Sequence, residues 1–120
     1  MPVRGLRGAT TVDQDTVSEV TVKTKELVSR MLEVNEIGKE QLISIIFTAT
    51  NDIHCMFPAA AARELGLGDV PLMCARELDI VGATTLCLRV LMHLETSKGR
   101  GELHHVYLHG AKGLRDDLPE

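Results

Sequence analysis

The chain has 120 residues, 44% of them hydrophobic, which is enough for one domain (residues 1–120) with a single core. Its formal net charge of −4 and its aromatic content of 2%, with no tryptophan, argue against a protein that binds nucleic acids, because such proteins present basic surfaces and stacking rings. No apolar stretch approaches the ~20 residues of a membrane span, the N-terminus lacks the apolar core of a signal peptide, and the three cysteines form no CxxC pair. We therefore expect a cytoplasmic protein without a membrane partner, whose cysteines are reduced thiols.

The first half of the chain predicts two strands separated by a long helix. Residues 3–10 predict a strand with two glycines, which often mark a bulge or a close approach of the backbone to another element. Thr16 and Glu19 have the spacing of a capping box, and apolar residues follow at helical spacing. We expect an amphipathic helix from about residue 16 to about residue 35, and a nearly apolar strand over residues 42–49.

The second half predicts a short helix and three more strands. Pro58 stands at the first position of the helix and Gly66 at its end, and the strands cover residues 70–74, 87–94 and 105–108. The predicted fold class is α/β (α+β), with a mixed sheet of about five strands packed on one long and one short helix. Two helices cover one face of such a sheet, yet the strands at 42–49 and 87–94 carry apolar residues on both faces. We therefore expect a closed homo-oligomer that buries the second face.

One charged residue interrupts the apolar strand at residues 87–94. Arg89 lies between Leu88 and Val90, and burying an unpaired guanidinium costs several kcal/mol or more. The chain must supply a carboxylate, let the side chain reach an edge, or reserve Arg89 for an external anion. The strand alone does not decide between an internal ion pair and a binding site.

Other polar residues, taken together with Arg89, favour a binding site for an anion. Arg7 on the first strand, Arg63 on the short helix, Arg89 and Tyr107 could together hold a carboxylate-bearing ligand, because guanidinium groups bind carboxylates bidentately and stay charged at neutral pH. Glu77 could pair with Arg89 or accept a hydrogen bond from a substrate hydroxyl. Each residue alone is more simply a surface charge or an ion-pair partner. The histidines lack metal-site spacing, and Cys74 has no evident base that would make it a nucleophile.

Several short motifs, in order along nearly the whole chain, resemble the bacterial monofunctional chorismate mutases of the trimeric α/β type. They are residues 4–12 (RGLRGATTV), 57–59 (FPA) with 62–65 (AREL), 70–71 (VP) leading to Cys74 and Glu77, 88–90 (LRV) and 105–108 (HVYL). Each motif is modest, but their combination is specific.

The resemblance implies a homotrimer forming a pseudo-barrel, with sites between neighbouring subunits that convert chorismate to prephenate in aromatic amino-acid biosynthesis, without a cofactor or metal. It implies that Arg7 and Tyr107 bind a substrate carboxylate, that Arg89 faces a carboxylate and the ether oxygen, and that Cys74 and Glu77 contact the hydroxyl side. Arg89, Glu77 and Arg7 would be the catalytic residues. The other residues that the resemblance places against the substrate are Phe57 and Leu114 as walls, Arg63 and Arg115 at the mouth, and Ala59, Met73, Ala75 and Arg76.

Two departures and two alternatives accompany this hypothesis. Ala60 stands where some similar proteins carry a lysine, so a basic contact from that position is absent here. Asp116 stands where a proline is common, which leaves the conformation of the tail and its role in closing the pocket open. A Claisen rearrangement is unimolecular and needs no nucleophile, metal or proton transfer, so fixed arginines suffice. The alternatives are an imine deaminase of similar trimeric outline, which would have to activate water, and a non-catalytic trimer that binds an acidic metabolite.

Overall fold

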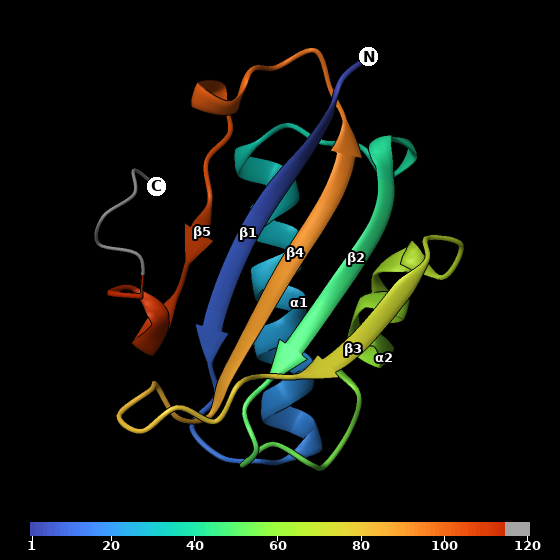
Figure 1. The fold of residues 1–120 in the computed structure, drawn as a ribbon. Helices are drawn as coiled ribbons and strands as arrows, with labels where there is room; N and C mark the ends of the chain where they lie inside the picture. The colour runs from blue at the N-terminus through green and yellow to red at the C-terminus, as the bar shows by residue number, and fades with distance from the viewer. Residues whose placement is uncertain (115–120) are drawn as a thin grey trace.

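The computed structural model describes residues 1–114, which form a five-stranded mixed sheet with two helices against one of its faces (Figure 1). The strand order is β3-β2-β4-β1-β5. The strands are β1 (Val3–Thr11), β2 (Leu42–Ala49), β3 (Leu72–Arg76), β4 (Cys87–Glu95) and β5 (Val106–Tyr107), and the helices are α1 (Val17–Val34) and α2 (Pro58–Ala62). The predicted fold class is confirmed.

The central strand, β4, sets the register of the sheet. It runs antiparallel to both β1 and β2, while β3 and β5 pair in parallel at the two edges. This register places Arg89 opposite Ala9 of β1 on one side and opposite Thr48 of β2 on the other. Arg89 therefore sits at the middle of the sheet.

The helix α1 begins where the sequence predicts, with Thr16 as its N-cap. The Thr16 hydroxyl accepts a hydrogen bond from the Glu19 amide at 3.2 Å, which satisfies one of the free donors of the first turn. The Glu19 carboxylate accepts from the amide of Asp13 at 2.8 Å, so the second half of the capping box reaches further back than the sequence predicts. These bonds fix the segment that leads from β1 into α1.

The core lies between α1 and the sheet, and Gly8 allows the two to approach closely. A Cβ atom at Gly8 would lie 2.5 Å from the Sδ atom of Met31, which is far inside van der Waals contact. Met31 and Leu27 of α1 are fully buried, as is Leu6 of β1. The close backbone approach that the glycines of the first strand predict is confirmed at Gly8.

The segment between α2 and β3 differs from the prediction at one point. A wide helical turn, Arg63–Leu67, follows α2. Gly66 has a left-handed backbone at φ 84° and so interrupts the helical conformation at the position that the sequence predicts. The predicted strand at 70–74 is wrong by two residues, because β3 covers Leu72–Arg76. The amide of Val70 closes a turn onto the carbonyl of Leu67 at 3.1 Å, which keeps Val70 out of the sheet.

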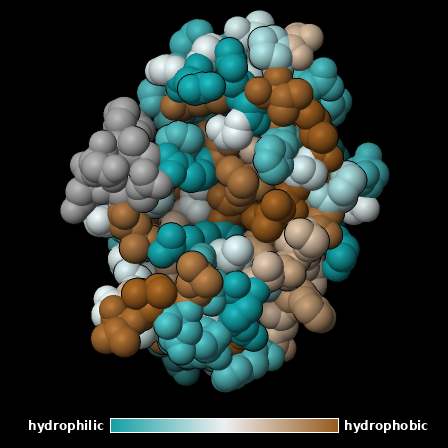
Figure 2. Space-filling model, viewed as in Figure 1, coloured by the Kyte–Doolittle hydropathy of each residue, from teal (hydrophilic) through white to brown (hydrophobic). Residues whose placement is uncertain are grey.

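The other face of the sheet carries no helix within residues 1–114 (Figure 1). Met73 is 58% exposed and Val3 57% exposed on this open face, and Ile46 and Leu91 lie side by side on it. Figure 2 views the molecule from this side and shows apolar side chains gathered across its middle among polar ones. The expectation that one sheet face stays uncovered in a single subunit is confirmed. No helix of the described residues is long and apolar enough to cross a membrane.

Candidate active site

Arg89 projects from the centre of β4 on the open face of the sheet. Its neighbours Leu88 and Val90 point to the opposite face and are buried, as strand alternation requires. The Arg89 side chain is 41% exposed, so the structure holds it at the floor of an open depression instead of in the core.

Glu77 and Thr48 meet Arg89 on this face. Glu77 follows β3 directly, and its amide donates to the carbonyl of Ala49 at 3.0 Å, which extends the pairing with β2. One carboxylate oxygen, Oε2, accepts from the Thr48 hydroxyl at 2.6 Å and lies 3.2 Å from Nε of Arg89. The ion pair between Arg89 and Glu77 that the sequence allowed is present. The sequence did not single out Thr48 as a site residue, although a polar residue in a nearly apolar strand is the same kind of signal that pointed to Arg89.

This ion pair does not satisfy the Arg89 guanidinium. Nε of Arg89 is buried and makes no hydrogen bond within the described residues, because its N–H is poorly aligned with the carboxylate oxygen. A guanidinium has five N–H donors, and one shared carboxylate oxygen leaves donors for a ligand. The structure thus shows Arg89 as an ion-pair partner that keeps donors for an external anion.

A pocket of about 250 Å³ lies over Arg89 and is walled by residues from four strands. Arg7 of β1 and Tyr107 of β5 line it together with Leu114. The Tyr107 hydroxyl is buried and has no hydrogen-bond partner within residues 1–114, so it is available to a ligand. The pocket joins two guanidinium groups, one carboxylate and one phenol over an apolar floor, which suits a ligand bearing carboxylates and a hydroxyl.

The backbone around Arg7 is held from the β5 side. The Arg7 amide donates to Nδ1 of His105 at 3.0 Å, and the carbonyl of Ala9 accepts from the amide of Leu108 at 2.9 Å. These bonds fix Tyr107 beside Arg7. The side chain of Arg7 forms no ion pair with a carboxylate of residues 1–114, which leaves its charge for a ligand.

The remaining predicted residues that line a cavity lie in a second pocket. This pocket, of about 330 Å³, is lined by Phe57, Ala59, Arg63, Leu72 and Cys74. Phe57 immediately precedes α2 and is 72% exposed, which is unusual for so large an apolar side chain. The structure therefore divides the predicted site into two groups on one subunit.

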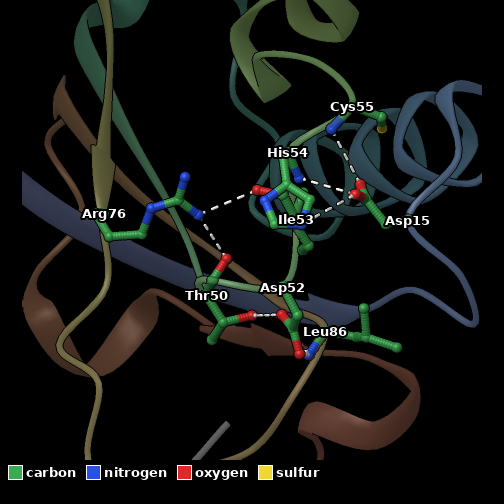
Figure 3. A network of polar contacts seen from close by, with 8 residues as sticks. All are labelled: Asp15, Thr50, Asp52, Ile53, His54, Cys55, Arg76 and Leu86. Carbon is green, nitrogen blue, oxygen red and sulfur yellow. Dashed lines mark hydrogen bonds and ion pairs between the residues drawn. The ribbon is translucent and has the colours of Figure 1, made fainter.

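Three predicted site residues line neither of these two pockets, and a fourth lies outside the described residues. Met73 and Ala75 are exposed on β3, and the guanidinium of Arg76 donates to the carbonyls of Thr50 and Ile53 at 2.7 and 3.0 Å (Figure 3). Arg115 lies outside the described residues, as does Asp116.

No cysteine provides an obvious nucleophile here. Cys87 is 1% exposed, and burial raises the pKa of its thiol more than the neighbouring Arg89 lowers it, so Cys87 is protonated at neutral pH. Within residues 1–114, no three His, Cys, Asp or Glu side chains lie close enough together to hold a metal ion.

Comparisons with known proteins agree with this geometry. Residues 3–118 match the family model for chorismate mutase type I. Two curated proteins named chorismate mutase AroH are similar over nearly the whole chain: that of Bacillus subtilis (strain 168) is 42% identical over 98% of this chain and 94% of its own length, and that of Thermus thermophilus is 44% identical over 97% and 96%.

A solved structure shares the fold. The chorismate mutase from Clostridium thermocellum superimposes with a TM-score of 0.89 at 44% sequence identity, covering 91% of this chain and 97% of the other. The family match, the two relatives and the shared fold confirm the resemblance inferred from the short motifs: the chain belongs to the type I chorismate mutase family.

Proposed function

We propose that this chorismate mutase rearranges chorismate to prephenate at a site built by two neighbouring subunits of a homotrimer. The observation that carries the proposal is the pocket over Arg89, where Arg7, Glu77 and Tyr107 converge and where the Arg89 Nε and the Tyr107 hydroxyl make no hydrogen bond within residues 1–114. The product serves aromatic amino-acid biosynthesis. The three cysteines are free thiols, which suits a reducing cytoplasm.

The chemistry needs little beyond this arrangement. In the rearrangement a carbon–oxygen bond of the ether breaks while a carbon–carbon bond forms within the same molecule, and no proton is transferred. The enzyme can hold the reactive chair-like conformer and stabilise the negative charge that develops on the ether oxygen. Permanently charged arginines perform both tasks.

Each polar side chain of the pocket has a defined role toward the substrate. Arg89 donates to the ether oxygen and to a carboxylate, Arg7 and Tyr107 bind a carboxylate, and Glu77 accepts from the substrate hydroxyl. Glu77 also orients Arg89, since its Oε2 lies 3.2 Å from Nε and is held in turn by Thr48. Because Thr48 and Glu77 hold Arg89 before any ligand arrives, the pocket is preorganised.

The second pocket supports the shared site. Phe57, Arg63 and Cys74 lie apart from the pocket over Arg89 in one subunit, and the apolar open face of the sheet lacks a covering element within residues 1–114. We propose that three subunits pack through this open face, so that Phe57 and Arg63 of one subunit close the Arg89 pocket of its neighbour. Phe57, exposed in a single subunit, then contacts substrate.

The direct test is to mix the purified protein with chorismate and to follow the loss of its absorbance together with the appearance of prephenate. We expect the same rate after treatment with a chelator and little change between about pH 6 and pH 8, because no general base has to titrate. A bell-shaped pH profile would favour the deaminase alternative, and binding of chorismate without turnover would favour the non-catalytic alternative.

A mixed-subunit experiment tests the shared site. Arg89→Met and Arg63→Met proteins are each expected to be nearly inactive, since each lacks one half of every site. Co-expressed subunits should recover about a quarter of the wild-type rate, because random mixing gives one intact site in three quarters of the trimers. No recovery in mixed trimers would place both halves in the same subunit.

A further inference from the structure

The loop at residues 50–57, between β2 and α2, is tied to the start of β4 through Thr50 and Asp52 (Figure 3). Both oxygens of Asp52 accept hydrogen bonds from the amide of Leu86, at 3.1 and 2.9 Å. The Thr50 hydroxyl donates to Asp52 at 2.5 Å and accepts from the amide of Cys87 at 3.0 Å. Side chains of this loop therefore hold Leu86 and Cys87, where the chain enters β4.

The residue that Asp52 holds has an unusual backbone conformation. Leu86 lies at φ 49°, in the left-handed region that leucine rarely adopts. Its carbonyl accepts from the amide of Val12 at 2.9 Å, so the peptide is fixed on both sides. The chain turns at Leu86 from the loop at residues 77–86 into β4, and Arg89 follows three residues later.

The loop that carries Asp52 is itself anchored beside Glu77. Arg76 donates to the carbonyls of Thr50 and Ile53, at 2.7 and 3.0 Å, and Arg76 is the residue before Glu77. The amide of Thr50 also donates to the carbonyl of Cys87 at 3.1 Å. The same short loop thus contacts the end of the strand that presents Glu77 and the start of the strand that presents Arg89.

We propose that Asp52 is a positioning residue: it holds Leu86 in its left-handed conformation and so sets where β4 places Arg89 against Glu77 and the substrate. Asp52 does not line the pocket over Arg89 and does not touch the reacting atoms. This inference rests on the proposed function, since its main effect is on the rate of the rearrangement.

The test compares Asp52→Ala, Leu86→Gly and the double variant with the wild type and with a control, Asp69→Ala. Asp69 is exposed and lines neither site pocket, so its replacement should change nothing. Asp52→Ala should lower kcat about tenfold with a smaller change in KM, because small displacements of catalytic groups cost rate. The assay is run well below the unfolding midpoint, with circular dichroism and sizing to show that each variant is folded and assembled.

Leu86→Gly separates positioning from general stability. Glycine adopts positive φ without a supporting contact, so Leu86→Gly alone should have near-normal kcat, and the double variant should recover most of the loss caused by Asp52→Ala. In the protein without substrate, the NMR shift of the Arg89 Nε–H should move in Asp52→Ala and return in the double variant.

Two results would overturn the inference. One is a normal kcat with an unmoved Arg89 resonance in Asp52→Ala. The other is a loss of kcat that follows the fall in the unfolding midpoint and that Leu86→Gly does not restore, which would give Asp52 a role in stability only. An inactive wild type would instead remove the proposed function, and the Arg89 resonance would still test the positioning.

Discussion

At the scale of single residues, Arg89 pairs with Glu77 in the structure and contacts substrate under the proposed function, and substitutions can separate the two effects. Glu77 Oε2 lies 3.2 Å from Nε of Arg89 without forming a hydrogen bond to it. The ion pair is partly exposed on both sides, so solvent screens it and its contribution to stability is small. Most of what Arg89 contributes should therefore appear in catalysis.

Arg89→Met should lower kcat by about 10²–10³, the scale for losing one preorganised electrostatic donor. Arg89→Lys should recover part of the rate, because a single ammonium cannot serve a carboxylate and the ether oxygen with the geometry of a planar fork. Steady-state kinetics with circular dichroism and sizing measures both. A folded, assembled Arg89→Met protein with near-normal kcat would reduce Arg89 to a structural partner of Glu77.

The second prediction at this scale concerns acid stability. Partial burial raises the pKa of Asp52, but the hydrogen bonds from Thr50 and from the Leu86 backbone together lower it more, so its pKa lies below the usual 3.8. The unfolded chain then binds the proton more readily. The stabilisation by Asp52 is complete above pH 3.8 and is lost as the pH falls through its lower value in the folded protein.

Urea unfolding at several pH values between about 5 and 2 should show this loss. The free energy of unfolding should fall less steeply with decreasing pH in Asp52→Asn than in the wild type. Asp15 adds to the same slope, because the Cys55 thiol and the His54 backbone lower the pKa of its carboxyl group. Asp69→Asn should keep the wild-type slope. Equal slopes for Asp52→Asn and the wild type would contradict the assignment of the shift to Asp52.

At the scale of the elements, the distance between α1 and β1 depends on Gly8. Gly8→Ala would put a Cβ atom 2.5 Å from Sδ of Met31 and 3.1 Å from a methyl of Leu27, so the helix has to shift or repack. We expect a loss of about 1–3 kcal/mol in the free energy of unfolding, as for other overpacked cores. Gly5→Ala on the same strand is the control, because its Cβ would meet only Leu91, at 3.7 Å. Similar stability of the two variants would show that α1 adapts freely.

Sequence patterns predicted some elements better than others for physical reasons. The bounds of β2 agree because nearly all its residues are apolar, and α1 agrees within a residue or two because Thr16 caps it. Within residues 1–114, β3 is an edge strand that pairs only with β2. Its last residues, Ala75 and Arg76, are exposed, so no apolar pattern marks where it ends.

The candidate site divides in the same way. The pairing of Arg89 with Glu77 could be foreseen, because a charge in an apolar strand needs a partner. The separation of Phe57 and Arg63 from that pair could not be foreseen, since it depends on α2 packing beside β3, on the face opposite to Arg89 (Figure 1). The role of Arg76 was also hidden, because its backbone hydrogen bonds depend on the path of the loop at residues 50–57.

At the scale of the whole molecule, the open face of the sheet predicts assembly. Light scattering at micromolar concentration should report three subunits, and the unfolding temperature should rise with protein concentration. Met73→Glu on the open face should weaken the assembly, whereas Val22→Glu on α1, at a similarly exposed position, should not. A stable monomer with full activity would exclude both the trimer and the shared site.

Glu77 also bears on how quickly the site empties after each reaction. The pocket over Arg89 holds two guanidinium groups and one carboxylate, so these three side chains carry one net positive charge. Chorismate, the proposed substrate, carries two carboxylates. A pocket with uncompensated arginines would bind substrate, transition state and product more tightly alike, which gives no gain in kcat and delays departure of the product. Under the proposed function, the carboxylate beside Arg89 therefore favours turnover as well as orientation. It lowers the electrostatic attraction that substrate and product share, so that the site discriminates mainly by the negative charge that develops on the ether oxygen in the transition state.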